Sequence, residues 1–205
     1  MEGLDRNRKD VEDRKESLKG ELLRKCIHLA GLGYIPFYIL TDRLTTLTVV
    51  AFLTLIAIFI EILRRRGEIF PGWILRSYER RGIGAYVYFG ISMLVVTLLF
   101  SLQASFVAIA CGSAGDGTAG IMKRFWVRAA PVSMFLASLV VVLAVSTTVS
   151  ITPSAAIIAI ILATVVEAKF QRLGKYYIND NLSVPLVAAV VYELFEVFYR
   201  ILISY

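Results

Sequence analysis

Cysteine and histidine are scarce in this sequence, and their scarcity narrows the chemistry that the chain can carry. Its 205 residues include two cysteines and one histidine. Cys26 and Cys111 lie beside apolar segments without metal-ligand spacing, so we expect both to be reduced and structural. The first 25 residues are charged throughout and lack an apolar core. That absence argues against a cleavable signal peptide.

Apolar residues, by contrast, dominate the chain. They make up 58% of it, and the mean hydropathy is +0.71, which is typical of a polytopic membrane protein rather than a soluble domain. The net charge of +6 could suggest a nucleic acid partner, but the basic residues form short blocks between apolar runs of spanning length. We therefore interpret them as topology signals and contacts to membrane lipids, and expect no nucleic acid partner.

The apolar runs predict an all-α fold, a polytopic transmembrane helical bundle of about seven spans. The spans are expected near residues 26–41, 44–63, 84–102, 104–122, 130–149, 153–168 and 183–203. Gly31, Gly33 and Pro36 predict that the first of them is irregular. Because no internal repeat or low-complexity linker interrupts the chain, residues 26–205 are expected to form one transmembrane catalytic domain. Residues 1–25 carry a thin apolar stripe among charges, which is typical of an amphipathic helix at the membrane surface.

The distribution of basic residues predicts the orientation in the membrane. With the N-terminus in the cytoplasm, residues 1–25, 64–83, 123–129 and 169–182 are cytoplasmic and hold 20 of the 22 basic residues. Only Arg43 and Arg200 are left outside. So uneven a distribution favours seven spans, with the N-terminus in the cytoplasm and the C-terminus outside. A functional site formed by the basic segments would then also be cytoplasmic.

Unusual polar residues gather on the cytoplasmic side of this arrangement. In the first group, helical offsets of 0, +3, +4 and +7 put the residues on one helix face: Glu21, Arg24, Lys25 and His28. Three further groups lie where spans meet the same membrane face: Asp116, Lys123 and Arg124; Glu167; and Asp180 with Asn181. The convergence of carboxylates, bases, an amide and the only histidine indicates a functional site.

The centre of the candidate site is Asp116, which stands among four glycines: Gly112, Gly115, Gly117 and Gly120. Small residues let membrane helices pack closely, but this does not explain an aspartate, which is costly in a span unless it is functional. The match to the dinucleotide pattern GxGxxG is weak because no βαβ unit surrounds it, and Thr118 stands where the Walker pattern requires lysine. Backbone N–H groups freed by glycine could still bind phosphate together with Lys123 and Arg124.

Each of the flanking residues also has a simpler structural interpretation. Glu21 and Lys25 could form an ordinary surface ion pair. His28 could bond a backbone carbonyl. Lys123 and Arg124 could act only as positive-inside anchors.

Three glutamates lie outside the candidate site. Glu61 precedes three arginines, and we expect its side chain to reach them. Glu193 and Glu196 fall within the last span without an evident basic partner, and they could line a cavity.

Three blocks of the chain carry a family resemblance. They are Glu21-Leu22-Leu23-Arg24-Lys25-Cys26-Ile27-His28, then Gly115-Asp116-Gly117-Thr118-Ala119, and finally Glu167 with Asp180-Asn181-Leu182-Ser183-Val184-Pro185. In order and spacing they resemble the membrane-bound polyprenol kinase family, which includes dolichol kinase, phytol kinase and the CTP-dependent diacylglycerol kinases. The family's basic loop after the second block is usually longer than the stretch from Lys123 to Arg128 in this chain.

The resemblance implies transfer of a phosphoryl group from a nucleoside triphosphate, commonly CTP, to the hydroxyl of an isoprenoid such as dolichol or of another lipid alcohol, with Mg²⁺ as cofactor. It implies that Asp116 binds Mg²⁺ or accepts the hydroxyl proton, and that His28 orients the alcohol or a phosphate oxygen. It also implies that Glu167, Asp180 and Asn181 complete the metal or acceptor site. Glu21 would lie near the substrate. The resemblance implies that basic side chains and backbone groups bind the phosphates. The side chains are those of Arg24, Lys25, Lys123 and Arg124, and the backbone groups are those of Gly112, Gly115, Gly117, Thr118 and Gly120.

Other functions stay open at this point. A CDP-alcohol phosphotransferase is disfavoured, because its pattern requires alanine and then arginine where Gly120 and Ile121 stand. A cytidylyltransferase acting on a lipid phosphate would use the same nucleotide, metal and lipid. A transporter or channel would need polar residues across the whole bilayer, whereas here the charges crowd one face.

Overall fold

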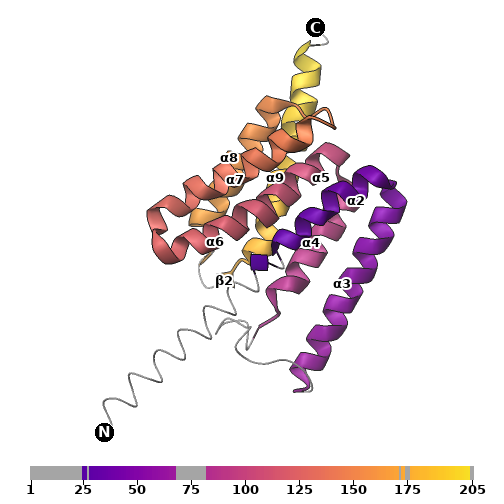
Figure 1. Ribbon diagram of the computed structural model, residues 1–205, viewed down its shortest axis with the longest axis vertical. Helices are drawn as coiled ribbons and strands as arrows, with labels where there is room; N and C mark the ends of the chain where they lie inside the picture. The colour runs from indigo at the N-terminus through magenta and orange to yellow at the C-terminus, as the bar shows by residue number, and fades with distance from the viewer. Residues whose placement is uncertain (1–24, 27, 68–81, 171, 174–175, 204–205) are drawn as a thin grey trace.

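The computed structural model describes residues 25–26, 28–67, 82–170, 172–173 and 176–203. The chain forms a helical bundle (Figure 1), which confirms the all-α prediction. The α-helices are α2 (Tyr34–Leu40), α3 (Arg43–Arg65), α4 (Ala85–Leu99), α5 (Leu102–Ile109), α6 (Asp116–Phe125), α7 (Ala130–Ser146), α8 (Pro153–Lys169) and α9 (Asp180–Ile203). The shorter elements are the 3-10 turns η1 (Gly31–Gly33) and η3 (Val127–Ala129), the π-helical η2 (Ala110–Gly115), and the antiparallel strands β1 (Arg172–Leu173) and β2 (Tyr176–Tyr177).

Local sequence explains where several helices begin. The Asp42 side chain caps α3 by accepting a hydrogen bond from Thr45 N at 2.9 Å, and Ser101 caps α5 in the same way. Proline occupies the first turn of both α7 and α8, where its missing N–H costs nothing. The predicted irregularity of the first span is confirmed, because Gly31–Gly33 form a 3-10 turn ahead of α2.

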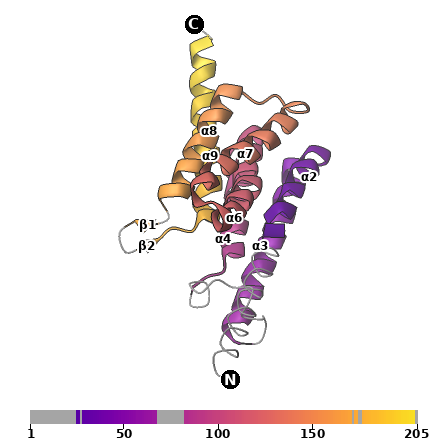
Figure 2. The ribbon, with the colours of Figure 1, turned by 60° about the vertical axis from the view of Figure 1, so that its left-hand side comes forward.

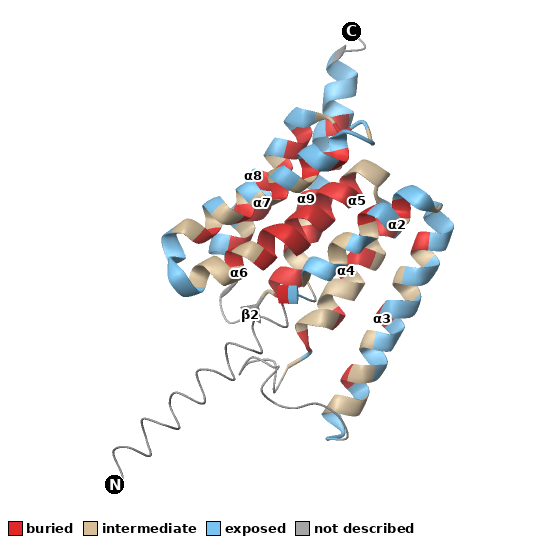
Figure 3. Cartoon of the chain, in the orientation of Figure 1, coloured by how far each residue is buried: buried red, intermediate tan, exposed pale blue. Residues whose placement is uncertain are grey.

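At the centre of the bundle, α5, η2 and α6 follow one another without a break. Every residue from 104 to 117 is buried, and Figure 3 shows this buried stretch running through the middle of the molecule. A helix enclosed on all sides must be apolar or small on all sides, and α4, α7 and α9 pack around this one. The fourth predicted span is therefore the core helix, and its helical ends lie at Leu102 and Phe125.

The middle of this core helix, η2, is π-helical and built from small residues. The Asp116 N–H donates to the carbonyl of Cys111, five residues earlier, which widens the turn. Close packing also depends on two glycines: a Cβ at Gly112 would lie 2.7 Å from Pro185 Cγ of α9, and one at Gly115 would overlap Ser138 of α7. Both cysteines of the chain are free, with Cys111 buried in η2.

The other helices surround this core unevenly. In both views α2 and α3 lie on one side of the bundle and α7 and α8 on the opposite side (Figure 1, Figure 2). α3 packs mainly on α4, and its outer surface exposes large apolar side chains such as Phe52 and Leu55. An apolar surface of this kind suits contact with lipid.

Three helical segments are long and apolar enough to cross a membrane: Arg43–Arg65, Val127–Ser146 and Asp180–Leu202. Two more, His28–Leu40 and Ala85–Leu99, are apolar but shorter. Helices occur at all seven expected positions, while the seven crossings and the orientation stay predictions. The expected amphipathic helix over residues 1–25 lies outside the described residues, except for Lys25.

The expectation for Glu61 is confirmed. Its carboxylate pairs with Arg64 Nη2 at 2.6 Å and with Arg65 Nε at 3.0 Å, and it accepts a hydrogen bond from Tyr86 Oη at 2.7 Å. Arg64 also donates to the Gly82 carbonyl at 2.7 Å. This cluster fastens the end of α3 to the start of α4.

Glu193 and Glu196 serve the opposite end of the bundle. Glu193 Oε2 accepts hydrogen bonds from the Ser101 hydroxyl at 2.6 Å and the Ser101 N–H at 3.2 Å, next to the start of α5. Glu196 does have a basic partner, because its Oε1 lies 2.6 Å from Arg200 Nη2 one turn later. Both carboxylates therefore have structural bonds that the sequence did not predict.

Candidate functional site

A buried ion pair joins the start of the described chain to the central helix. Lys25 Nζ lies 3.4 Å from Asp116 Oδ2 and donates to the Asp116 backbone carbonyl at 3.2 Å. The two side chains are only 3% and 8% exposed. Removing two charges from water costs several kcal/mol for each ion, on the order of what their attraction returns. A pair of this kind is therefore better evidence of a functional site than of stabilisation.

His28 lies one helical turn beyond Lys25 and faces the same carboxylate. Its Nδ1 is 3.8 Å from Asp116 Oδ2 and 3.4 Å from the Gly112 carbonyl oxygen. The ring also packs against Phe89 of α4, with 5.5 Å between ring centroids. The histidine thus contacts a backbone carbonyl, as the simpler interpretation has it, and also borders Asp116.

Gly120 provides the surface on which the Lys25 side chain rests. It lies one turn past Asp116 on the same face of α6. A Cβ atom at this position would overlap both Nζ and Cε of Lys25. The absence of a side chain at Gly120 therefore leaves the room that the ammonium group occupies.

A second ion pair lies farther along this face of α6. Lys123 follows Asp116 by two turns, about 10 Å along the axis, and its Nζ pairs with Oε1 of Glu167 at the end of α8. The Glu167 side chain is 1% exposed, and its Oε2 has no hydrogen-bond partner within the described part of the chain. A buried carboxylate oxygen without a partner is an available acceptor for a hydroxyl group or a cation.

The start of α9 carries three consecutive buried polar residues. Asn181 Nδ2 donates to Asn179 Oδ1 at 3.1 Å and to Asp180 Oδ1 at 3.0 Å. Asn181 Oδ1, however, is buried and has no partner among the residues that the structure describes. Pro185, one turn later, packs on Gly112 and so ties this end of α9 to the central helix.

Thr118 faces away from the ion pair. It follows Asp116 by two positions, which turns its side chain to another side of α6. Its hydroxyl lies within hydrogen-bond distance of the backbone carbonyls of Ala114 at 2.8 Å and of Ser133 in α7 at 3.3 Å. The predicted phosphate ligand is thus engaged in packing against α7, as is Gly115. Gly117 borders Leu29, which would lie 3.8 Å from an added Cβ.

Sequence reasoning missed Ser113, which is fully buried in η2. Hydroxyls such as those of Thr54, Thr97 and Thr164 donate to the carbonyl four residues earlier, but Ser113 Oγ has no partner in the described ranges. It faces Gly31, where an added Cβ would lie 2.7 Å away. The available signal was a hydroxyl among alanine and glycine, one turn before Asp116.

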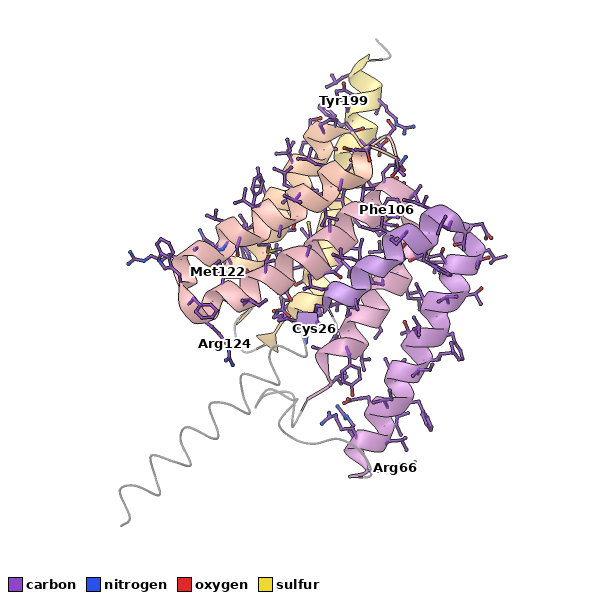
Figure 4. The ribbon with its side chains drawn as sticks, in the orientation of Figure 1. Cys26, Arg66, Phe106, Met122, Arg124 and Tyr199 are labelled. Carbon is purple, nitrogen blue, oxygen red and sulfur yellow. The ribbon has the colours of Figure 1, made fainter. Side chains whose placement is uncertain are left out.

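The remaining predicted residues lie apart from this cluster or outside the described ranges. Arg124 is exposed at the end of α6 and points away from the bundle (Figure 4). Glu21 and Arg24 fall outside the described residues.

A magnesium site can be judged by the oxygen donors. Within the ranges that the structure describes, no three or more histidine, cysteine, aspartate or glutamate residues are grouped as a metal site would require. Mg²⁺ usually takes one or two protein carboxylates and completes its shell with phosphate oxygens and water. The donors Asp116, Glu167, Asp180 and Asn181 are of the kind that Mg²⁺ prefers, so they suit an ion that arrives with a nucleotide.

Comparison with known proteins adds no relative: no protein-family model, no curated protein and no solved structure matches this chain.

Proposed function

We propose that the protein is a membrane lipid-alcohol kinase, which transfers a phosphoryl group from CTP or another nucleoside triphosphate to the hydroxyl of a polyprenol such as dolichol. One observation carries the proposal: a single face of α6 gathers a buried carboxylate and two ammonium groups, from Asp116, Lys25 and Lys123. Phosphoryl transfer depends on positioning and on neutralising negative charge, and these groups suit both tasks.

The place of this face also supports a lipid substrate. α6 ends at Phe125, and the candidate span Val127–Ser146 begins directly after it. In this proposal the Lys123 end of α6 lies at a membrane boundary. A lipid alcohol can keep its tail in the bilayer there and present its hydroxyl to a nucleotide from the aqueous side, which we propose to be the cytoplasm.

In the proposed reaction, the hydroxyl oxygen of the lipid forms a bond to the γ-phosphorus, the bond from that phosphorus to the β–γ bridging oxygen breaks, and CDP leaves when CTP is the donor. Asp116 accepts the hydroxyl proton. Lys25 and Lys123 pair with phosphate oxygens. When Lys25 exchanges Asp116 for phosphate, the carboxylate is released to accept the hydroxyl proton of the lipid.

The other groups have supporting roles in the proposal. His28 orients the alcohol or a phosphate oxygen beside Asp116. Glu167 Oε2 and Asn181 Oδ1, the two buried oxygens without partners in the described ranges, bind the acceptor hydroxyl or, with Asp116 and Asp180, a magnesium ion. That ion, when bound, supplies positive charge to the phosphates.

The test is direct phosphorylation with the purified full chain in detergent and Mg²⁺. Dolichol, phytol, geranylgeraniol and diacylglycerol would each be incubated with CTP, ATP and GTP carrying labelled γ-phosphate. We expect the label in the lipid product. Transfer of an α-phosphate label to a lipid phosphate would instead identify a cytidylyltransferase, and no labelled lipid with any pair would overturn the proposal.

Asp116→Asn tests the assigned base. It keeps the size of the side chain but removes its charge, so we expect turnover to fall at least about 100-fold, the usual loss for a general base. Asp42→Asn is the matched control, because it removes a carboxylate from the cap of α3 and asparagine still caps well. Wild-type turnover in Asp116→Asn would sink the assignment.

A further inference from the structure

The turn between α6 and α7 presents apolar and basic side chains together at its surface. Phe125, Trp126 and Val127 are 79%, 67% and 68% exposed, and Arg124 and Arg128 beside them are also exposed. The backbone turns sharply at Trp126, with φ −152° and ψ 89°, before the 3-10 turn η3 begins. We refer to residues 124–128 as the α6–α7 tip.

Charge at the tip is of one sign. Residues 124–128 include two arginines and no aspartate or glutamate. The Glu167 carboxylate pairs with Lys123, which precedes the tip. Arg124 and Arg128 therefore add two positive charges to an apolar protrusion, a combination that suits an anionic, partly apolar partner.

The position of the tip identifies that partner. The candidate span Val127–Ser146 begins within it, so the tip lies at the level where hydrocarbon meets headgroups. Tryptophan and phenylalanine favour this level. The planar guanidinium group of arginine matches the oxygens of a phosphodiester.

We propose that the α6–α7 tip binds anionic phospholipid headgroups of the membrane that the protein crosses, with Arg124 and Arg128 on the lipid phosphates and Phe125 and Trp126 inserted beside them. Such binding fixes the end of the helix that carries Asp116 and Lys123. The proposal does not depend on kinase activity.

Tryptophan fluorescence provides the test, because the chain has only two tryptophans. Trp73→Phe leaves Trp126 as the only one. The full chain would be reconstituted in vesicles of phosphatidylcholine and phosphatidylglycerol, with bromine on one lipid at a time as the quencher. We expect stronger quenching by brominated phosphatidylglycerol than by brominated phosphatidylcholine at equal mole fraction. Each arginine near the membrane surface should enrich the anionic lipid around the tip about fivefold.

Two variants in the Trp73→Phe background make the test specific. Arg124→Gln with Arg128→Gln should abolish the preference for phosphatidylglycerol. Arg66→Gln with Lys169→Gln removes the same charge from exposed positions elsewhere and should leave the preference intact. Equal quenching by both lipids, a preference that survives the first double variant, or no quenching of Trp126 by either lipid would each overturn the proposal. Should Trp73→Phe fail to fold, native mass spectrometry of the wild-type chain and the two double variants would count bound phosphatidylglycerol with the same expected order.

Discussion

Lys25 and Asp116 are separated by 91 positions in the sequence, yet their side chains meet 3.4 Å apart inside the bundle. The contact joins the chain where it approaches the first helix to the middle of the core helix. Neither residue has a reason to be buried without the other, because an isolated buried charge is far costlier than a paired one. The same pair therefore affects both the stability of the bundle and the proposed phosphoryl transfer.

Replacing only one residue of the pair should lower the stability of the fold. Lys25→Met leaves the Asp116 carboxylate buried without its cation, and we expect the free energy of unfolding to fall by about 3–5 kcal/mol. Unfolding in mixed detergent with increasing denaturing surfactant measures it. The double variant Lys25→Met with Asp116→Leu should regain most of that stability without regaining lipid phosphorylation. A double variant as unstable as the single one would contradict this account.

The two glycines after Asp116 should respond differently to alanine. Gly117→Ala should raise the free energy of unfolding by up to about 1 kcal/mol, because alanine favours the helix and its Cβ meets only Leu29, at 3.8 Å. Gly120→Ala forces the Lys25 ammonium group to move, so we expect a smaller gain or a loss. In Gly120→Ala, lipid phosphorylation should fall as well. Equal stabilisation by both substitutions would show that Lys25 does not need the space at Gly120.

The Glu61 cluster should affect stability alone. Glu61→Ala leaves Arg64 and Tyr86 without their shared acceptor between α3 and α4, and we expect a loss of about 3–5 kcal/mol in the free energy of unfolding. The turnover of the protein that remains folded should be unchanged, because the cluster shares no residue with the Lys25–Asp116 pair. Glu196→Ala is the matched control, because its partner Arg200 is largely exposed and such pairs contribute little.

Acid should weaken the cap of α3. Hydrogen bonds from the Thr45 side chain and backbone hold the pKa of the Asp42 carboxyl below its ordinary value. Because the folded pKa is the lower one, the ionised cap stabilises the fold above the unfolded pKa, and this contribution disappears as the pH falls through the folded pKa. Thermal unfolding midpoints from about pH 6 to about pH 3 should therefore drop more in the wild type than in Asp42→Asn. Parallel curves would contradict the assignment.

Much of the fold can be predicted from the sequence because apolar runs and caps are local signals. The helices fall where the runs predicted, and Gly31 and Gly33 predicted the irregular first segment. The approach of Lys25 and His28 to the same carboxylate is explained by their offset of three residues on one helix.

The partners across the bundle could not be predicted, because they depend on packing between distant segments. Nothing in the local sequence pairs Lys123 with Glu167, 44 positions away. The orientation of Thr118 depends on the exact phase of the helix after η2, and a run of alanine, glycine and serine specifies a π turn no better than an α turn. Ser113 was missed for the same reason.

The π-helical η2 has a consequence for how the site tolerates an inserted or deleted residue. A π turn holds one residue more than an α turn, so it absorbs an inserted residue locally and leaves the helix on either side in the same phase. Deleting one residue from Ala110 to Ala114 would therefore replace η2 by a regular α turn and leave Asp116 facing Lys25. An inserted or deleted residue in this stretch would thus change the packing of the small residues of η2 while the polar site keeps its geometry.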